Sequence, residues 1–390
     1  MVVAGEASGD QHASELVAAL QSRRPELRFF GMGGPKLAGR SMELLYGAHE
    51  VSVMGITEVL PKLFRILQVM RGLARAAEER RPALAILVDI PDFNLRMAKK
   101  LKRMGVPVIY YISPMVWAWR AGRVRAIART VDRMLCILPF EEGFYRGSGV
   151  DAVYVGSPVL EQVPAPASAE SFRQQLGLQA SVPTLALLPG SRLSEISRIL
   201  PDMVRTAVLM TKKHPGLQVV VPLAPSVPRA LIESYFLHSG VAPVLLEGRA
   251  AEVVGASDGA IVASGTAALE AGLMQRPFVV VYRVSLLTYW MGRLLLKVAH
   301  VALVNLLAGR RIVPELLQGD FTPERVAAAL EHVWTGPART TLLEGLEEVR
   351  HSLGPRGAAQ RGAEEVLALL KRHSKIDAGV KPSVIEFPPP

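Results

Sequence analysis

The feature that most constrains this chain is an alternation between short β-branched runs and longer stretches with helical periodicity. This alternation is typical of a parallel sheet whose strands are joined by crossover helices. It predicts strands at 2–4, 83–88, 108–112, 133–138, 152–155, 184–188, 218–221, 259–263 and 278–282. A stretch rich in Pro, Ala and Ser at 163–171 divides these strands into two sets and is typical of a linker.

We therefore expect an α/β fold of two doubly wound, Rossmann-like domains with a cleft between them. The N-terminal domain is expected at 1–162 and the C-terminal domain at 172–340, followed by C-terminal helices at 341–373. Residues 374–390 show no periodicity and end in three prolines, so we expect a disordered tail there.

The composition narrows the class of partner. The chain has 390 residues, and its 45 Lys and Arg exceed its 35 Asp and Glu, for a formal net charge of +10. This balance favours an anionic partner: nucleic acid, a membrane surface or a phosphorylated small molecule. A single cysteine, Cys136, excludes a disulfide framework within the chain and fits a reducing compartment, so we expect a cytoplasmic protein. We expect no signal peptide and no membrane-spanning segment.

Polar residues follow six of the apolar runs, where ligands bind in open α/β sheets. Asp89 follows a fully apolar run, so a half-desolvated carboxylate with a raised pKa would suit a general base. The alternative is a buried aspartate that caps a neighbouring turn. Glu6 and Asp10 follow the first strand and are further acidic candidates.

The stretch "LLPGSR" ends a strand just before a helix begins. Gly190 and Ser191 lie where unpaired backbone N–H groups can receive phosphate oxygens, and Arg192 adds a permanently charged planar fork. The alternative is that Ser191 or Ser194 is an ordinary N-cap and Arg192 a solvated charge.

The stretch "ASGTAALE" repeats this arrangement with Ser264, Gly265 and Thr266. Glu270 lies four residues beyond Thr266 on the same helical face, where a carboxylate can accept hydrogen bonds from the two hydroxyls of a ribose. Alternatively, Glu270 only complements the helix dipole. Two such turns in one domain suggest a nucleotide diphosphate that lies across both.

Several kinds of site are excluded. "GMGGPKLAG" does not have the spacing of a dinucleotide fingerprint, and no Walker motif is present. The histidines are scattered without ligand spacing, and no Asp-x-Asp pair could hold a metal against a diphosphate. We therefore expect a mechanism without a metal or another cofactor.

Residues 60–74 form an amphipathic pattern with basic residues on the other faces. Its apolar residues include Leu63, Phe64, Leu67 and Met70, which suit contact with anionic lipid or an acyl chain. Packing on the core of the domain is the alternative. A second stretch around Trp290 combines aromatic and basic residues in the mixture that membrane interfaces favour.

These motifs resemble the lipid-A-disaccharide synthase family. The matching stretches run in order from about residue 2 to 330 and are "AGEASGD", "MGITEVL", "DIPDFN", "SPMVWAWR", "LPFE", "LLPGSR", "ASGTAALE", "YRVSLLTYW" and "NLLAGRRIVPELLQ". The resemblance implies a GT-B glycosyltransferase that joins UDP-2,3-diacylglucosamine to 2,3-diacylglucosamine 1-phosphate with inversion and without a metal, giving a β-1,6-linked disaccharide and UDP. It also implies a protein peripheral to the cytoplasmic face of the inner membrane, and a possible intertwined homodimer.

The resemblance also implies roles for individual residues. Asp89 would be the base that deprotonates the acceptor 6-hydroxyl, with Glu6 and Asp10 on the acceptor side. The residues that would hold UDP are Arg192, Glu270, Asn305 and, as a further donor-side candidate, Arg283.

Two alternative functions remain at this point. A UDP-sugar 2-epimerase shares the two-domain fold and needs acidic residues in the cleft, but it needs no apolar surface. A basic nucleic-acid or membrane adaptor would use the net charge, but it gives no reason for polar residues at six strand ends. We therefore expect no nucleic-acid partner.

Overall fold

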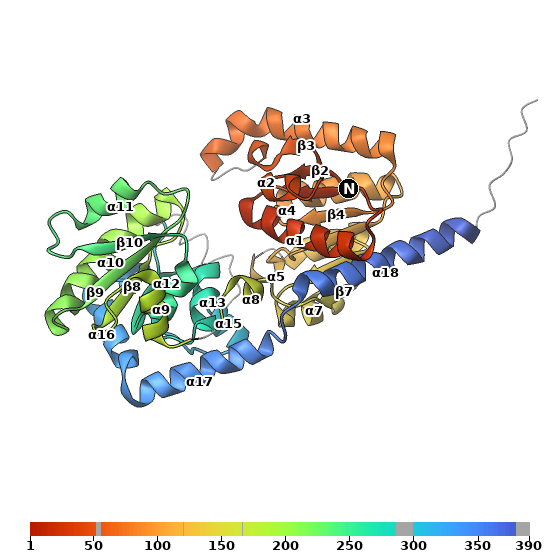
Figure 1. Ribbon diagram of the computed structural model, residues 1–390. Coiled ribbons are helices and arrows are strands. Elements are labelled where there is room, and N and C mark those ends of the chain that lie inside the picture. Colours follow the sequence, from red (N-terminus) through yellow and green to blue (C-terminus); the bar gives the residue numbers. More distant parts are fainter. Residues whose placement is uncertain (52–55, 120, 166, 286–298, 380–390) are drawn as a thin grey trace, which may run out of the picture. The chain divides into compact units, whose positions relative to one another are not determined.

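The computed structural model describes residues 1–51, 56–119, 121–165, 167–285 and 299–379, and the chain divides into two compact units (Figure 1). Unit 1 contains residues 1–158 and the C-terminal segment from Arg356, and unit 2 contains residues 159–355. The change of unit after Pro158 comes before the stretch 163–171 that the sequence suggested as a linker. The chain then returns to unit 1 for its last helix.

Unit 1 contains a parallel sheet of seven strands within the described ranges, in the order β3-β2-β1-β4-β5-β6-β7. Its strands are β1 (Val2–Ala4), β2 (Phe30–Gly33), β3 (Glu43–Gly47), β4 (Ala85–Val88), β5 (Val108–Tyr111), β6 (Arg133–Cys136) and β7 (Ala152–Tyr154). Its helices are α1 (Ala7–Arg23), α2 (Pro35–Ala38), α3 (Ile56–Arg80), α4 (Pro91–Arg103), α5 (Val116–Trp119), α6 (Val124–Thr130), α7 (Pro139–Arg146) and α18 (Ala358–Gly379), with short 3₁₀ turns at Ala48–Glu50 and Ala121–Arg123.

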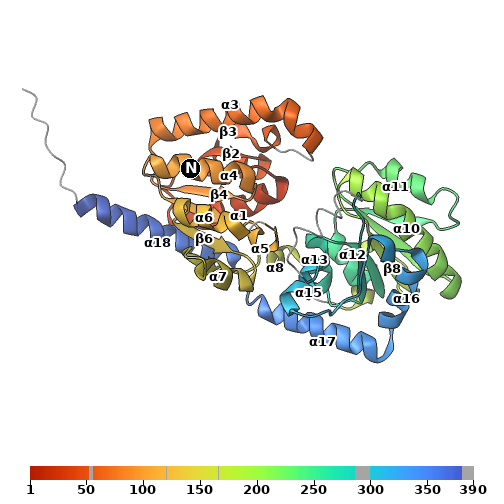
Figure 2. The same ribbon diagram turned by 180° about the vertical axis from the view of Figure 1, so that it is seen from behind.

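Successive apolar residues of β1, β4, β5 and β6 pack into two different cores, because side chains alternate between the two faces of a sheet. Val3 packs in the core under α3, α4 and α6, whereas Ala4 packs in the core under α1 and α18. Figure 1 views the face that carries α1, and Figure 2 views the face that carries α4 and α6. Both faces are covered, and the inner strands β1, β4 and β5 are accordingly apolar throughout, as in other buried parallel sheets.

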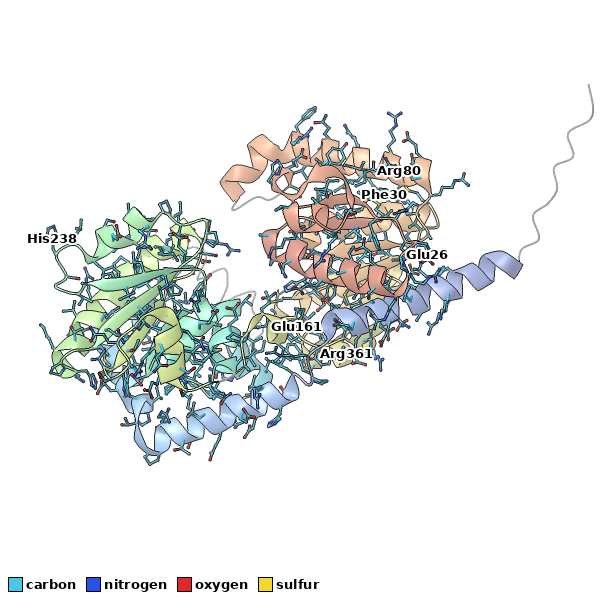
Figure 3. All side chains as sticks on the ribbon, viewed as in Figure 1. Glu26, Phe30, Arg80, Glu161, His238 and Arg361 are labelled. Atoms are coloured by element: carbon cyan, nitrogen blue, oxygen red, sulfur yellow. The ribbon has the colours of Figure 1, made fainter. Side chains whose placement is uncertain are left out.

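The C-terminal helix α18 is part of unit 1 and packs against α1. Ala363 and Val366 are buried in the core that α1 also enters, and Arg361, labelled in Figure 3, donates from Nε to the Val155 carbonyl at 2.8 Å. The helix continues to Gly379, so the expectation of a disordered tail from residue 374 is wrong for 374–379. Residues 380–390 lie outside the described part of the chain.

Unit 2 contains a parallel sheet of six strands among the described residues, in the order β10-β9-β8-β11-β12-β13. Its strands are β8 (Thr184–Leu188), β9 (Gln218–Leu223), β10 (Pro243–Glu247), β11 (Gly259–Ala263), β12 (Phe278–Tyr282) and β13 (Glu315–Leu317). Its helices are α8 (Val159–Gln162), α9 (Ala169–Leu176), α10 (Leu193–Lys213), α11 (Arg229–Phe236), α12 (Ala250–Ala256), α13 (Thr266–Leu273), α15 (Leu303–Ala308), α16 (Pro323–Trp334) and α17 (Gly336–Ser352), with a 3₁₀ turn at Gln318–Asp320.

The structure contains every strand that the sequence predicted, with ends that differ by up to two residues. It adds four strands that the sequence analysis missed, namely β2, β3, β10 and β13. Among the residues that the structure describes, no helix has both the length and the apolar character needed to cross a membrane.

Candidate active site

The sheet of unit 1 reverses its strand order between β1 and β4. The chain runs from β1 outward to β2 and β3 and then returns to place β4 on the other side of β1. Ligands of doubly wound sheets bind beyond the carboxyl ends of the strands at such a switch point. Glu6 follows β1 and Asp89 follows β4, so two of the three acidic candidates flank the switch point of unit 1.

Asp89 is held in an uncommon backbone conformation. Its φ is 55° and that of Ile90 is 38°, so two consecutive residues with side chains adopt the left-handed region. A Cβ built on Gly9 in the first turn of α1 would lie 3.7 Å from the Asp89 Cβ, which places the Asp89 side chain against the start of α1. Burial raises the pKa of Asp89, and the Ile90 N–H and the nearby His12 oppose that rise. A carboxylate with a raised pKa is suited to accept a proton.

The Asp10 carboxylate is engaged by backbone N–H groups of unit 1. Its Oδ1 accepts hydrogen bonds from the N–H groups of Gly34 at 2.7 Å and Leu37 at 3.2 Å, and its Oδ2 accepts one from Lys36 at 2.9 Å. The residue is 2% exposed. Asp10 therefore caps the start of α2, which gives it a structural role, and its assignment as a catalytic or acceptor-side residue stays a prediction.

Glu6 occupies the N-cap position of α1, and its side chain does not cap that helix. The residue is exposed, while its carbonyl accepts the Asp10 N–H at 2.8 Å. Glu6 thus stays at the carboxyl edge of the sheet, where the sequence placed it. It remains a candidate for the acceptor side.

Unit 2 repeats this topology with its own switch point between β8 and β11. These strands are paired in parallel, with Val262 opposite Leu188, and each leads through a glycine turn into a helix. Gly190 has a φ of 99° and Gly265 a φ of 152°, a region that favours glycine. A Cβ built on Gly190 would lie 3.9 Å from the Ala263 Cβ, so the two turns are neighbours at one edge of the sheet.

No side chain caps the N-terminus of either helix that follows these turns. The N-cap position of α10 is Arg192 and that of α13 is Gly265, and neither helix has a side-chain cap. The alternative in which Ser191 or Ser194 caps α10 is therefore wrong. Two uncapped helix starts at adjacent strands present N–H groups and positive dipole ends to the same edge, which suits an anion such as a diphosphate.

Charged and hydroxyl side chains surround the two turns. Arg192 is 57% exposed and forms an ion pair with Glu195 at 3.1 Å, an exposed pair of little strength that an incoming phosphate can replace. Ser191 and Thr266 are exposed, and the Ser264 hydroxyl donates to the Val301 carbonyl at 3.3 Å. The predicted set from both turns is therefore gathered at one edge of the sheet of unit 2.

Glu270 lies one turn inside α13. Burial raises the pKa of its carboxyl group, and no cation contributes to that shift. Among the described residues it forms no ion pair, unlike the carboxylates of Asp202 and Asp258 in the same unit. A half-buried carboxylate in this state can accept hydrogen bonds from a ligand with hydroxyl groups.

Two predicted donor-side residues, Asn305 and Arg283, form hydrogen bonds inside unit 2. The Asn305 amide donates to the Val313 carbonyl at 2.9 Å and to Glu315 at 2.7 Å, and its oxygen accepts the N–H groups of Ile312 and Val313. The Arg283 guanidinium binds Asp202 and the Phe321 carbonyl, each at 2.5 Å. Both side chains therefore have partners within unit 2, and their contact with UDP stays a prediction.

Sequence reasoning missed two buried titratable groups of unit 1, one of which lies near Asp89. His12 is buried on α1 three residues after Gly9, and it lowers the pKa of Asp89. Glu141 in the "LPFE" stretch is 1% exposed and accepts the Trp117 indole N–H at 3.0 Å. The helical spacing of Gly9 and His12 could have indicated the first, whereas nothing local in the sequence links Glu141 to Trp117.

The lipid-contact candidates on α3 divide between surface and core. Leu63, Phe64 and Leu67 are 39%, 76% and 36% exposed, which is unusual for neighbouring large apolar side chains. Met70 is 4% exposed and packs in the core of unit 1, so its assignment to lipid contact is wrong. Trp290 lies outside the described residues.

Comparison with known families gives a consistent result. The family model described as lipid-A-disaccharide synthetase matches residues 1–344. The chain is 68% identical over 371 residues to the lipid-A-disaccharide synthase of Myxococcus xanthus (strain DK1622), covering 95% of this chain and 97% of that protein. It is 55% identical over 373 residues to the enzyme of the same name from Anaeromyxobacter sp. (strain K), covering 95% and 97%.

Solved structures with the same fold are more distant in sequence. The S. aureus MnaA–UDP structure matches with a TM-score of 0.63 at 11% identity, covering 99% of both chains. CalG4, the calicheamicin glycosyltransferase, matches with a TM-score of 0.60 at 14% identity, covering 96% of this chain and 98% of that one. These likenesses establish a GT-B type fold of two Rossmann-like sheets. The likeness to UDP-N-acetylglucosamine 2-epimerases, at 12% identity, likewise extends to the fold alone.

Proposed function

The chain belongs to the lipid-A-disaccharide synthase family and is a glycosyltransferase of lipid A biosynthesis, and from this premise we propose how its two units share the reaction. Unit 2 binds UDP-2,3-diacylglucosamine, the donor, and unit 1 supplies the base for 2,3-diacylglucosamine 1-phosphate, the acceptor. The product is the β-1,6-linked disaccharide 1-phosphate, and UDP is released.

The observation that carries the donor assignment is the pair of uncapped helix starts after β8 and β11. The diphosphate lies across the turns at Gly190 and Gly265, and Arg192 leaves Glu195 to bind its oxygens. Glu270 accepts hydrogen bonds from the ribose hydroxyls. This arrangement supplies positive potential from backbone dipoles and one guanidinium, so charge that develops on the departing UDP is stabilised as the glycosidic bond to phosphate breaks.

Asp89 acts as the general base. Its carboxylate takes the proton of the acceptor 6-hydroxyl while that oxygen attacks the anomeric carbon of the donor, and UDP leaves from the opposite face with inversion. The raised pKa supports this role, because a base is more effective when its pKa lies closer to the working pH. The uncommon backbone conformation supports it too, since strained residues gather at functional sites.

We infer that the exposed apolar face of α3 contacts a lipid surface, and the exposure of three large apolar side chains supports this. Leu63, Phe64 and Leu67 enter the interfacial region of the cytoplasmic leaflet of the inner membrane, where the acylated substrates reside. Arg71 and Arg75, exposed on the same helix, attract anionic headgroups, and the net charge of +10 adds to that attraction.

The decisive experiment measures UDP release by the purified protein from the two acylated substrates, alone and together. We expect release only when both are present, and no conversion of UDP-N-acetylglucosamine to its 2-epimer. UDP release from the donor alone at the same rate, or epimerisation, would contradict the proposal.

Asp92 offers a matched control for the base, because it lies in the same "DIPDFN" stretch. It is an exposed carboxylate that pairs with Arg123 at 2.7 Å. Asp89→Asn should abolish turnover with little change in UDP affinity, whereas Asp92→Asn should retain turnover. Equal loss in both variants would mean that the stretch matters for folding and not for proton transfer.

A further inference from the structure

The backbone at Asp89 and Ile90 needs support from its surroundings. Both residues have positive φ values, and a β-branched side chain such as that of Ile90 disfavours this region strongly. Such a conformation persists only where neighbouring groups hold it. The groups that hold it here are identifiable from the contacts of a single atom, the carbonyl oxygen of Asp89.

Two buried side chains donate hydrogen bonds to this oxygen. The Tyr110 hydroxyl on β5 donates at 2.6 Å, and the Asn94 amide on α4 donates at 2.8 Å. The same Asn94 nitrogen lies 3.0 Å from the Val88 carbonyl. Tyr110 and Asn94 are both fully buried, so neither donor competes with water for its acceptor.

Gly5 and Gly9 pack closely against the side chains of Asp89 and Ile90. A Cβ on Gly5 would lie 2.4 Å from the Ile90 Cδ1, and a Cβ on Gly9 would contact the Asp89 Cβ at 3.7 Å. The loop is therefore clamped between α1 and the pair of donors. Contacts on both sides therefore fix the conformation of the loop. A residue such as Asp89 needs this support if its side chain is to point in one defined direction.

At Asn94, only the N–H donors of the side-chain amide take part in hydrogen bonds within the described part of the chain, and the amide oxygen does not. Its Oδ1 is buried and has no hydrogen-bond partner among the described residues. Turning the amide over would point that oxygen at the carbonyls of Val88 and Asp89, which is repulsive. An unsatisfied buried acceptor is costly, and its presence is consistent with selection for the two N–H donors on the other side.

We propose that Tyr110 and Asn94 are positioning residues for Asp89, which fix its carbonyl and thereby the direction of its carboxylate. The inference rests on the proposed role of Asp89 as the base. Neither residue touches substrate in this account. Each acts through the backbone of the strained loop.

Tyr145 provides a matched control for Tyr110. It is also a fully buried tyrosine of unit 1, and its hydroxyl donates to a backbone carbonyl, that of Pro114, at the same 2.6 Å. Replacing either tyrosine by phenylalanine removes one hydroxyl and leaves one carbonyl without that donor. The two variants should therefore lose similar stability, while only one of them disturbs Asp89.

The test compares Tyr110→Phe, Tyr145→Phe and wild type. We expect Tyr110→Phe to lower kcat at least tenfold with the KM of both substrates and the Kd of UDP within twofold, and Tyr145→Phe to keep kcat within twofold. Asn94→Ala should reproduce the kcat loss, and combining it with Tyr110→Phe should add little, since both act on one carbonyl. Equal kcat in the two tyrosine variants would overturn the inference.

A spectroscopic measurement makes the result independent of activity. The ¹³Cα and ¹³Cβ chemical shifts of Asp89 and Ile90 report the left-handed backbone, and they should change in Tyr110→Phe but not in Tyr145→Phe. Unchanged shifts in both variants would overturn the positioning role even if kcat fell. An inactive wild-type protein with shifted resonances in Tyr110→Phe would instead contradict the proposed function and leave the clamp standing.

Discussion

Replacing Asp10 by alanine tests whether an acidic residue at a strand exit serves folding or chemistry. The substitution removes the acceptor of three backbone N–H groups. Asp10 is only 2% exposed, so water has little access to replace the lost acceptor. A hydrogen bond to a charged acceptor contributes about 1.5 to 3 kcal/mol, but bonds that share one carboxylate do not add. We expect the free energy of unfolding of unit 1 to fall by about 3 to 5 kcal/mol, a large part of the roughly 5 to 15 kcal/mol that keeps a domain folded.

The assay is urea denaturation followed by circular dichroism, together with kcat corrected for the folded fraction. Asp10→Ala should retain turnover per folded molecule. Gly34→Ala should behave in the same way, because its Cβ would lie 2.6 Å from the Asp10 Oδ2 and displace the carboxylate from its three donors.

Asp89→Asn is the opposite control. The folded state raises the pKa of Asp89 above its unfolded value, so above that unfolded value the ionised side chain reduces stability. The neutral amide removes this cost, and the variant should be at least as stable as wild type at neutral pH while turnover is lost. If Asp10→Ala kept wild-type stability and lost turnover as Asp89→Asn does, the structural assignment of Asp10 would be refuted.

Three further predictions concern the base, the diphosphate and the lipid surface. The kcat should fall as the pH is lowered through the raised pKa of Asp89, because the protonated carboxyl group cannot accept a proton; an acid limb at the ordinary aspartate pKa would exclude Asp89 as the base. Arg192→Ala should weaken UDP binding by about 1.5 to 3 kcal/mol, measured by calorimetry, and unchanged affinity would remove Arg192 from the diphosphate site. Joint replacement of Leu63, Phe64 and Leu67 by serine should reduce sedimentation with anionic vesicles without lowering the melting temperature, since these side chains are exposed; unfolding would instead favour core packing.

The inner strands could be predicted from sequence because each is buried on both faces and is therefore continuously apolar. β8, β11 and β12 match the expected ranges at both ends. Three of the four missed strands, β3, β10 and β13, lie at sheet edges, where one side has no partner and the residues are more polar or exposed. The fourth, β2, contains Gly31, where a Cβ would lie 2.1 Å from the Val2 carbonyl oxygen, so only glycine fits at this position. Glycine has a low β-propensity, and its presence hides the strand from a sequence pattern.

The candidate site was predictable only as a set of positions. Sequence places a polar residue after a strand, but it does not show which backbone N–H groups turn toward that residue. Asp10 accepts hydrogen bonds from a turn that begins 24 residues later, and Asn305 accepts them from a loop that begins seven residues later. Such partners depend on how distant segments pack, and no local pattern reports them.

These outcomes suggest a physical criterion for polar residues at the ends of buried strands. Asp10, Arg283 and Asn305 are engaged by backbone groups or by a carboxylate of their own unit, so much of their hydrogen-bonding capacity is used within the fold. Asp89 and Glu270 differ, because burial raises the pKa of each and no cation offsets it for Glu270. A fold that leaves a carboxylate partly desolvated loses stability by doing so, whereas a capping carboxylate adds stability. A neutral substitution should therefore raise stability at a desolvated carboxylate and lower it at a capping carboxylate. The sign of this change identifies the residues whose hydrogen-bond partners are supplied by the substrate.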